Sequence, residues 1–192
     1  KINNDLQNKF NLEESQYEIT GLAVLYNNML QSLFQSQIGS LIIVFAVISL
    51  MLFLIFRSIK VVLIGLIPNI FVASSVMGLL GLFNIPLDIM TITVAAISVG
   101  MAVDNTIHYI YRYKKELKKN NSDQALKNAH GTTGRAIFYT ATTISAGFCI
   151  LILSNFFPTI LFGLFTSIAM ILAFISSLTL LPNLLVKYKV FQ

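Results

Sequence analysis

The stretch "VAAISVGMAVDNTIHYIYRY" (residues 94–113) is an apolar run that contains one carboxylate, Asp104, and a histidine, His108, four residues later. Its length and hydrophobicity are typical of a membrane-spanning helix. A carboxylate near the centre of such a helix costs roughly 2.5–3.5 kcal/mol on insertion scales. We therefore expect Asp104 to face protein or water and to have a function.

The rest of the chain is similarly apolar. Its 192 residues are 56% hydrophobic and 11% charged, whereas a soluble domain carries about 25% charged residues. A single cysteine, Cys149, lies in an apolar run, which excludes a disulfide framework and a zinc cluster. The composition predicts an all-α integral membrane protein without a metal site.

Five segments are long and apolar enough to cross a bilayer. They are residues 38–56, 61–82, 89–111, 136–155 and 159–185. Short connections, two of which contain Pro86 and Pro158, predict that neighbouring spans form antiparallel hairpins. We expect two parts, namely the end of an external domain with a stalk helix (1–37) and a membrane domain of five helices (38–192). The connection 112–135 is basic and amphipathic.

Two local signals predict helix irregularities. Before the fourth span, an Asn-Asn-Ser sequence predicts a break, with Ser122 placed to cap a short interfacial helix through Ala129. In the second span, Pro68 predicts a break or a kink, and the Asn69 side chain could satisfy the carbonyls that a proline leaves free.

The basic residues indicate the orientation. Apart from Lys1 and Lys9, they lie in the first and third connections and after the last span, whereas the second and fourth connections contain no lysine or arginine. By the positive-inside rule the N-terminal region is outside and the C-terminus is cytoplasmic. Topology and contact with anionic lipids therefore account for the net charge of +5. We do not expect a nucleic-acid partner, and "HGTTGR" (130–135) lacks the strand and lysine of a phosphate-binding loop.

Asp104 and His108 continue a stripe of small residues, Ala96 and Gly100, at four-residue spacing. Such a stripe allows another helix to pack closely, and removal of water favours the neutral form of a carboxylate. Proton exchange at Asp104 could then couple the membrane potential to helix packing. Alternatively, Asp104 only hydrogen-bonds its neighbours, and His108 only lies at the membrane interface.

The fourth span supplies candidate partners for this pair. Thr140 and Thr143 share one face of it and complete a predicted proton relay with Asp104 and His108. Alternatively, these hydroxyls bond to their own helix backbone. An intramembrane protease is excluded because only one intramembrane aspartate is present and no serine is paired with His108. We expect no catalytic residue and no enzyme activity.

These residues resemble the resistance-nodulation-division (RND) superfamily, in particular its MMPL-type hydrophobe exporters and the sterol-sensing relatives. The resemblance rests on "GMAVDNTIHYIYRYKKEL" (100–117) and on a series of motifs around it. These motifs are "LIGLIPN" (63–69), "GLFNIPLD" (81–88), "GTTGRAIFYTATTISAGF" (131–148) and "LLPNLL" (180–185). They cover nearly the whole chain, which is similar to the tail of an external domain and the last five spans of one transporter half.

The resemblance implies that the chain is part of a longer bacterial inner-membrane protein. That protein would export lipids, drugs or other hydrophobic or amphiphilic molecules. Export would use the proton gradient without a cofactor, and the family's relay aspartate falls on Asp104. Relatives often carry a second acid where this chain has Asn105. The expected partners are the other transporter half, a hydrophobic or lipid substrate and membrane lipids, with a homo-oligomer as a further option.

Two alternatives to export remain. They are a non-transporting, sterol-sensing-like module that binds lipid, and a proton-driven accessory component of protein secretion. A lipid sensor needs no titrating group, so Asp104 favours transport over sensing.

Overall fold

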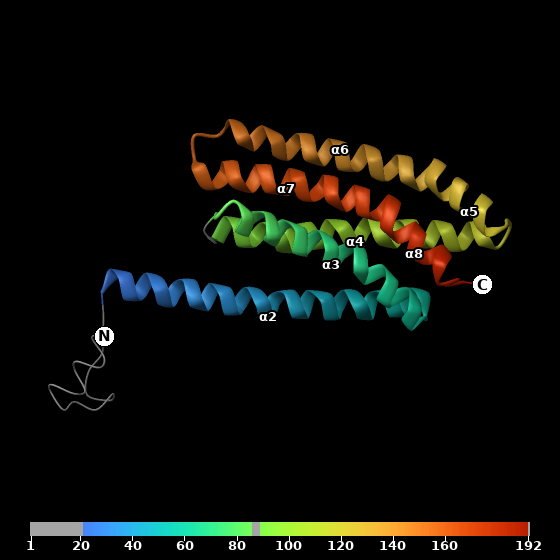
Figure 1. Cartoon of the computed structure of the whole chain (residues 1–192), viewed down its shortest axis with the longest axis horizontal. Coiled ribbons are helices and arrows are strands. Elements are labelled where there is room, and N and C mark those ends of the chain that lie inside the picture. The colour runs from blue at the N-terminus through green and yellow to red at the C-terminus, as the bar shows by residue number, and fades with distance from the viewer. Residues whose placement is uncertain (1–20, 86–88, 192) are drawn as a thin grey trace, which may run out of the picture. The chain divides into compact units, whose positions relative to one another are not determined.

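The computed structural model describes residues 21–85 and 89–191 (Figure 1). The structure divides into two units, residues 1–39 and residues 40–192. In the first unit the described part is the beginning of helix α2, and the second unit contains all other described elements. Residues 1–20, which form most of the segment predicted to end an external domain, lie outside the described residues, as does Pro86.

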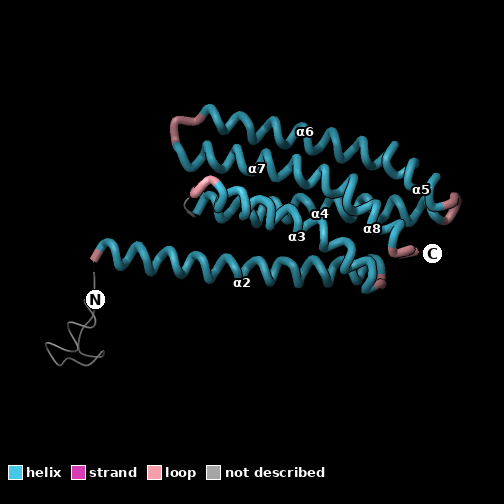
Figure 2. The backbone as a smooth tube through the Cα atoms, viewed as in Figure 1, coloured by secondary structure: helices cyan, strands magenta, loops and turns pink. Residues whose placement is uncertain are grey.

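The regular elements among the described residues are all helices, joined by short loops (Figure 2). The α-helices are α2 (Leu22–Phe56), α3 (Ile59–Leu82), α4 (Ile89–Leu117), α5 (Ser122–Ala129), α6 (Arg135–Cys149), α7 (Phe157–Ile175) and α8 (Leu181–Lys187). Two π-helical turns, η1 (His130–Gly134) and η3 (Ser176–Leu180), and one 3₁₀ turn, η2 (Ile150–Leu153), connect them. As predicted, Pro158 lies in the first turn of α7.

The connection 112–135 contains the predicted break and the predicted short helix through Ala129, which is α5. Helix α4 continues to Leu117, and α5, η1, α6 and η2 follow one another without a break. The predicted cap at Ser122 is wrong, because Asn121 precedes the helix and Ser122 is its first residue. The Ser122 hydroxyl lies 2.9 Å from that of Tyr113. Tyr113 is buried and its hydroxyl needs a partner, which explains why Ser122 does not cap.

The predicted break at Pro68 is also wrong, since α3 is continuous through it. Asn69 is buried and donates from Nδ2 to the carbonyl of Gly65 at 2.7 Å. The Ser176 hydroxyl donates to the carbonyl of Pro68 at 3.5 Å. Polar side chains thus bond the backbone around this proline, as expected for a proline inside an apolar helix.

Four helical runs in the described part of the chain are long and apolar enough to cross a membrane. They are Val24–Phe56, Ile59–Leu82, Ser122–Leu153 and Phe157–Lys187. Helix α4, which carries Asp104 and His108, is not among them, so the predicted count of five spans is not confirmed. The chain is a multi-pass, all-helical membrane protein.

Within the second unit, α4 packs against both α3 and α7, and α6 packs against α7 (Figure 1). One core surrounds Tyr109 and Tyr113 of α4, and a second joins α3 to Phe165 of α7. Residues of α4 on this side, such as Val99 and Val103, are buried, whereas Gly100 and Asp104 are exposed. The packing of α4 therefore leaves its polar stripe uncovered within the chain.

Candidate functional site

Asp104 and His108 form an ion-pair contact on α4. Nε2 of His108 lies 3.3 Å from Oδ1 of Asp104, one helical turn apart. Each side chain is 67% exposed, although both occur in an otherwise apolar helix. An exposed carboxylate and imidazole at this distance can share and exchange a proton.

A groove of about 350 Å³ lies between this pair on α4 and the side chains of η1 and α6. Its walls carry both polar and apolar groups. The lining residues outside the pair include Asn105 and Arg112 of α4, Thr132 and Thr133 of η1, and Ala136 and Thr140 of α6. The α4 carboxylate therefore faces a surface rich in hydroxyl groups.

Asn105 is the most deeply buried polar residue of the groove. It is 5% exposed, and its Nδ2 atom has no hydrogen-bond partner among the described residues. An unpaired amide donor of this kind costs about 1–3 kcal/mol. Asn105 therefore places a buried, unpaired amide donor in the wall of the groove beside Asp104.

Arg112 links the groove to the turn between α4 and α5. Its Nη2 atom lies 2.9 Å from Oε1 of Glu116, and Asn128 donates to Oε2 of the same carboxylate at 2.9 Å. The hydrogen bond from Asn128, together with the charge of Arg112, holds the pKa of Glu116 below its usual range. This network ties α5, and with it η1, to the end of α4.

The predicted relay residues do not all line the groove. Thr140 does, and its hydroxyl also donates to the carbonyl of Ala136 at 3.0 Å. Thr143 is exposed on α6 and is not among the lining residues. The structure thus brings Asp104, His108 and Thr140 to one groove, while the relay role of each residue stays a prediction.

The predicted packing stripe lies on the open side of α4. Gly100 is exposed, and a Cβ atom added there would have no neighbour within 4 Å. Ala96 is half-buried. The space beside Gly100 is compatible with a further helix, and the packing role of Ala96 and Gly100 stays a prediction.

Sequence reasoning missed Thr132, Thr133 and Arg112 as groove residues. The two threonines lie in the "HGTTGR" segment, which does not match a phosphate loop and which overlaps one of the RND-like motifs, but neither observation indicated a groove. Thr133, Ala136 and Thr140 follow one another at helical spacing. An earlier start of the fourth predicted helix would therefore have placed Thr133 on the same face as Thr140. Among the described residues, no three His, Cys, Asp or Glu side chains gather as metal ligands.

The MMPL family model matches residues 1–188 of the chain. A membrane protein of Methanocaldococcus jannaschii is 33% identical over 110 residues, which cover 57% of this chain and 28% of that protein. The hopanoid transporter HpnN of Burkholderia multivorans is 28% identical over 146 residues, which cover 75% of this chain and 16% of that transporter. The chain thus spans less than a third of the length of either relative. No solved structure matches the chain significantly.

Proposed function

Because the chain belongs to the MMPL family, we propose that it is the membrane domain of a proton-driven exporter of hydrophobic or amphiphilic molecules. At the family level, the likeness to a hopanoid transporter supports export of hydrophobic compounds. Hydrophobic lipids are accordingly the first substrate class to test. We place the protein in the bacterial inner membrane.

The single observation that supports proton coupling is the position of the Asp104 carboxylate. It is 67% exposed within the chain, and it belongs to an apolar helix in which a lipid-facing carboxylate is unfavourable. A second membrane segment, from the other half of the transporter or from a second copy, would cover Asp104 in the assembled protein. Protonation would then decide how that segment packs against α4, which is the basis of coupling.

Asp104, His108 and Thr140 form the proposed proton path. The Asp104–His108 contact of 3.3 Å allows the proton to pass between the carboxylate and the imidazole. The Thr140 hydroxyl, across the groove, can reorient and bond either form of the carboxylate. Thr143 would join this path only after a movement of α6.

For the membrane arrangement we propose five spans, with α4 as the third, an external N-terminal region and a cytoplasmic C-terminus. The basic residues at the end of α4 and on α5 support this orientation. Cysteine labelling in a Cys149→Ser background tests it. A cysteine at Asn155 should react in intact cells, and one at Lys127 only after the membrane is permeabilised. The reverse pattern would refute the orientation.

The test of function uses the full-length protein in proteoliposomes with an imposed pH gradient. Proton entry is followed with lumenal pyranine, and Nile red serves as the hydrophobic probe. We expect Asp104→Asn to insert and fold normally but to lose probe-dependent proton entry, because an amide does not take up a proton in this pH range.

Asp123→Asn is the matched control, since Asp123 is an exposed carboxylate on α5, outside the predicted spans. It should transport at the wild-type rate. Wild-type proton entry in Asp104→Asn would remove Asp104 from the coupling mechanism. If the wild-type protein binds lipid but shows no probe-dependent proton entry, the sterol-sensing alternative is favoured.

A further inference from the structure

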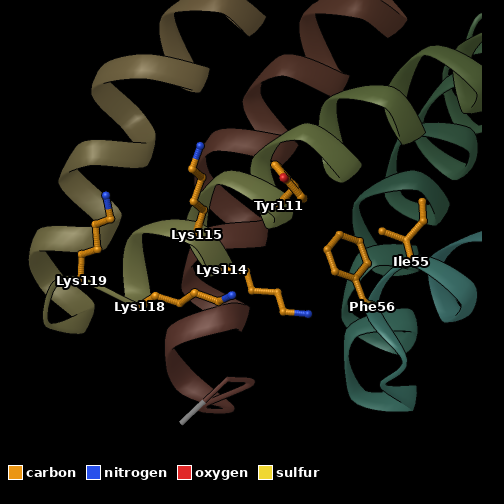
Figure 3. Close-up of a pocket in the computed structure, with 7 residues that line it drawn as sticks. All are labelled: Ile55, Phe56, Tyr111, Lys114, Lys115, Lys118 and Lys119. Atoms are coloured by element: carbon orange, nitrogen blue, oxygen red, sulfur yellow. The ribbon is translucent and has the colours of Figure 1, made fainter.

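A second groove, of about 430 Å³, lies at the C-terminal end of α4. In the proposed membrane arrangement this end is at the cytoplasmic side of the bilayer. The polar wall of this groove consists of two lysines from the last turn of α4 and two from the turn that follows this helix. They are Lys114, Lys115, Lys118 and Lys119. Figure 3 shows these four side chains around the end of α4, with Lys114 extended toward Phe56. The volume is within the range of about 300–1,000 Å³ for small-molecule sites.

The opposite wall of this groove is apolar and aromatic. Ile55 and Phe56, the last two residues of α2, form it together with Tyr111 of α4. The ammonium of Lys114 lies 5.6 Å from the ring centroid of Phe56 and 5.3 Å from that of Phe191. These cation–π contacts hold one positive charge in place beside the apolar wall.

The lysine cluster lies beside one carboxylate, that of Glu116, whose pKa the charge of Lys119 helps to lower. The acid nearest in sequence, Glu116, is already engaged by Arg112 at 2.9 Å and by Asn128 at 2.9 Å. Among the described residues, no other acidic side chain lies within salt-bridge distance of the four lysines. With four lysines and one partly engaged carboxylate, the groove carries a net positive charge, and an anion is the complementary ligand.

The position of the groove favours a lipid anion. The apolar run Val24–Phe56, which is long enough to span a membrane, ends at Phe56 in the groove wall. The predicted third span also ends at Tyr111, so the groove lies where apolar helix surface gives way to basic surface. Lipid phosphates lie at this depth, with acyl chains on the apolar side, and basic pockets between membrane helices bind such headgroups.

We propose that this groove binds one anionic phospholipid, with its phosphate on the lysines and Tyr111 and an acyl chain along Ile55. The Tyr111 hydroxyl donates a hydrogen bond to the phosphate, and the exposed Ile55 side chain contacts the first methylene groups of the chain. This site is separate from the Asp104 groove and does not depend on the proposed transport function.

Native mass spectrometry of the full-length protein in detergent tests the proposal with phosphatidylglycerol and phosphatidylcholine as probes. We expect one phosphatidylglycerol to bind more tightly than phosphatidylcholine. The variant Lys115→Gln/Lys118→Gln should raise the apparent Kd for phosphatidylglycerol about 25-fold, since each lysine near an anionic surface contributes roughly 1 kcal/mol, or about fivefold. Neither lysine makes a described ion pair or ring contact, so the helix packing should be retained.

The matched control, Lys127→Gln/Lys187→Gln, removes the same charge from exposed lysines outside the groove. It should leave the Kd for phosphatidylglycerol unchanged. An equal loss in both variants would mean nonspecific attraction and would overturn the proposal, as would equal wild-type affinity for the two lipids. Displacement of the lipid by equimolar inorganic phosphate would assign the groove to a free anion and would also overturn it.

Discussion

The Nε2 atom of His130 donates a hydrogen bond to the carbonyl oxygen of Leu178, 3.0 Å away and 48 residues later in the chain. In an α-helix that carbonyl would accept from residue 182, which is a proline without an N–H. With Nε2 as the donor, Nδ1 of the neutral imidazole accepts from the hydroxyl of Tyr109 at 2.7 Å. His130 thus joins α4 and both π-helical turns.

We predict that His130→Phe lowers the free energy of unfolding by about 2 kcal/mol or more, because it removes the bonds of His130 to the Leu178 carbonyl and to the buried Tyr109 hydroxyl. Thermal unfolding followed by circular dichroism measures the change. Tyr109→Phe breaks only one of the two bonds and should cost less. When Tyr109→Phe is added to His130→Phe, the further loss of unfolding free energy should be smaller than that of Tyr109→Phe alone. An unchanged melting temperature in His130→Phe would contradict the bridging role.

We predict that Gly163→Ala destabilises the α6–α7 hairpin by about 1–3 kcal/mol. A Cβ atom at Gly163 would lie 2.6 Å from the carbonyl oxygen of Phe148 and 2.7 Å from Cβ of Leu151. These are backbone or backbone-proximal atoms that cannot move independently. Gly147→Ala, on the same hairpin with no neighbour within 4 Å, is the control and should not destabilise. Equal melting temperatures for the two variants would show that the close approach is absent.

We predict a pH-dependent difference between the wild type and Glu116→Gln. The pKa of Glu116 is lowered from its ordinary value of 4.5, first by the Asn128 hydrogen bond and then by Arg112. Because the pKa of Glu116 is lower in the folded protein than in the unfolded chain, the ionised carboxylate stabilises the folded state above pH 4.5. This stabilisation is lost as the pH falls through the folded-state pKa. The wild type should therefore unfold at a higher temperature than Glu116→Gln at pH 6, and the difference should disappear under strongly acidic conditions. A constant difference across this range would count against the carboxylate network.

We predict that Thr140→Val slows probe-dependent proton entry about fivefold, the effect of one lost hydrogen bond of about 1 kcal/mol. Thr142→Val is the matched control. Both hydroxyls donate to a carbonyl four residues earlier on α6, at 3.0 Å and 2.8 Å, but only Thr140 lines the Asp104 groove. Equal slowing by the two substitutions would indicate an effect on the helix and not on the proton path.

Much of the helical arrangement could be predicted from the sequence, because apolar runs of membrane length and helix-starting prolines such as Pro158 act locally. The errors lie where a tertiary contact overrides a local preference. Ser122 has the chemistry of a cap, yet its hydroxyl lies beside that of Tyr113. Pro68 is unfavourable inside a helix, yet bonds from Asn69 and Ser176 accompany an unbroken α3.

The sequence by itself determined that the chain is a helical membrane protein and that a carboxylate interrupts one of its apolar helices. Both follow from hydrophobicity and spacing within a few turns. Only the tertiary structure decided what faces Asp104. The groove depends on η1, whose His130 bonds to Leu178 across 48 residues, and on the Glu116 network that ties α5 to α4. Contacts between residues so far apart in the chain depend on how the helices pack, which local sequence preferences do not specify.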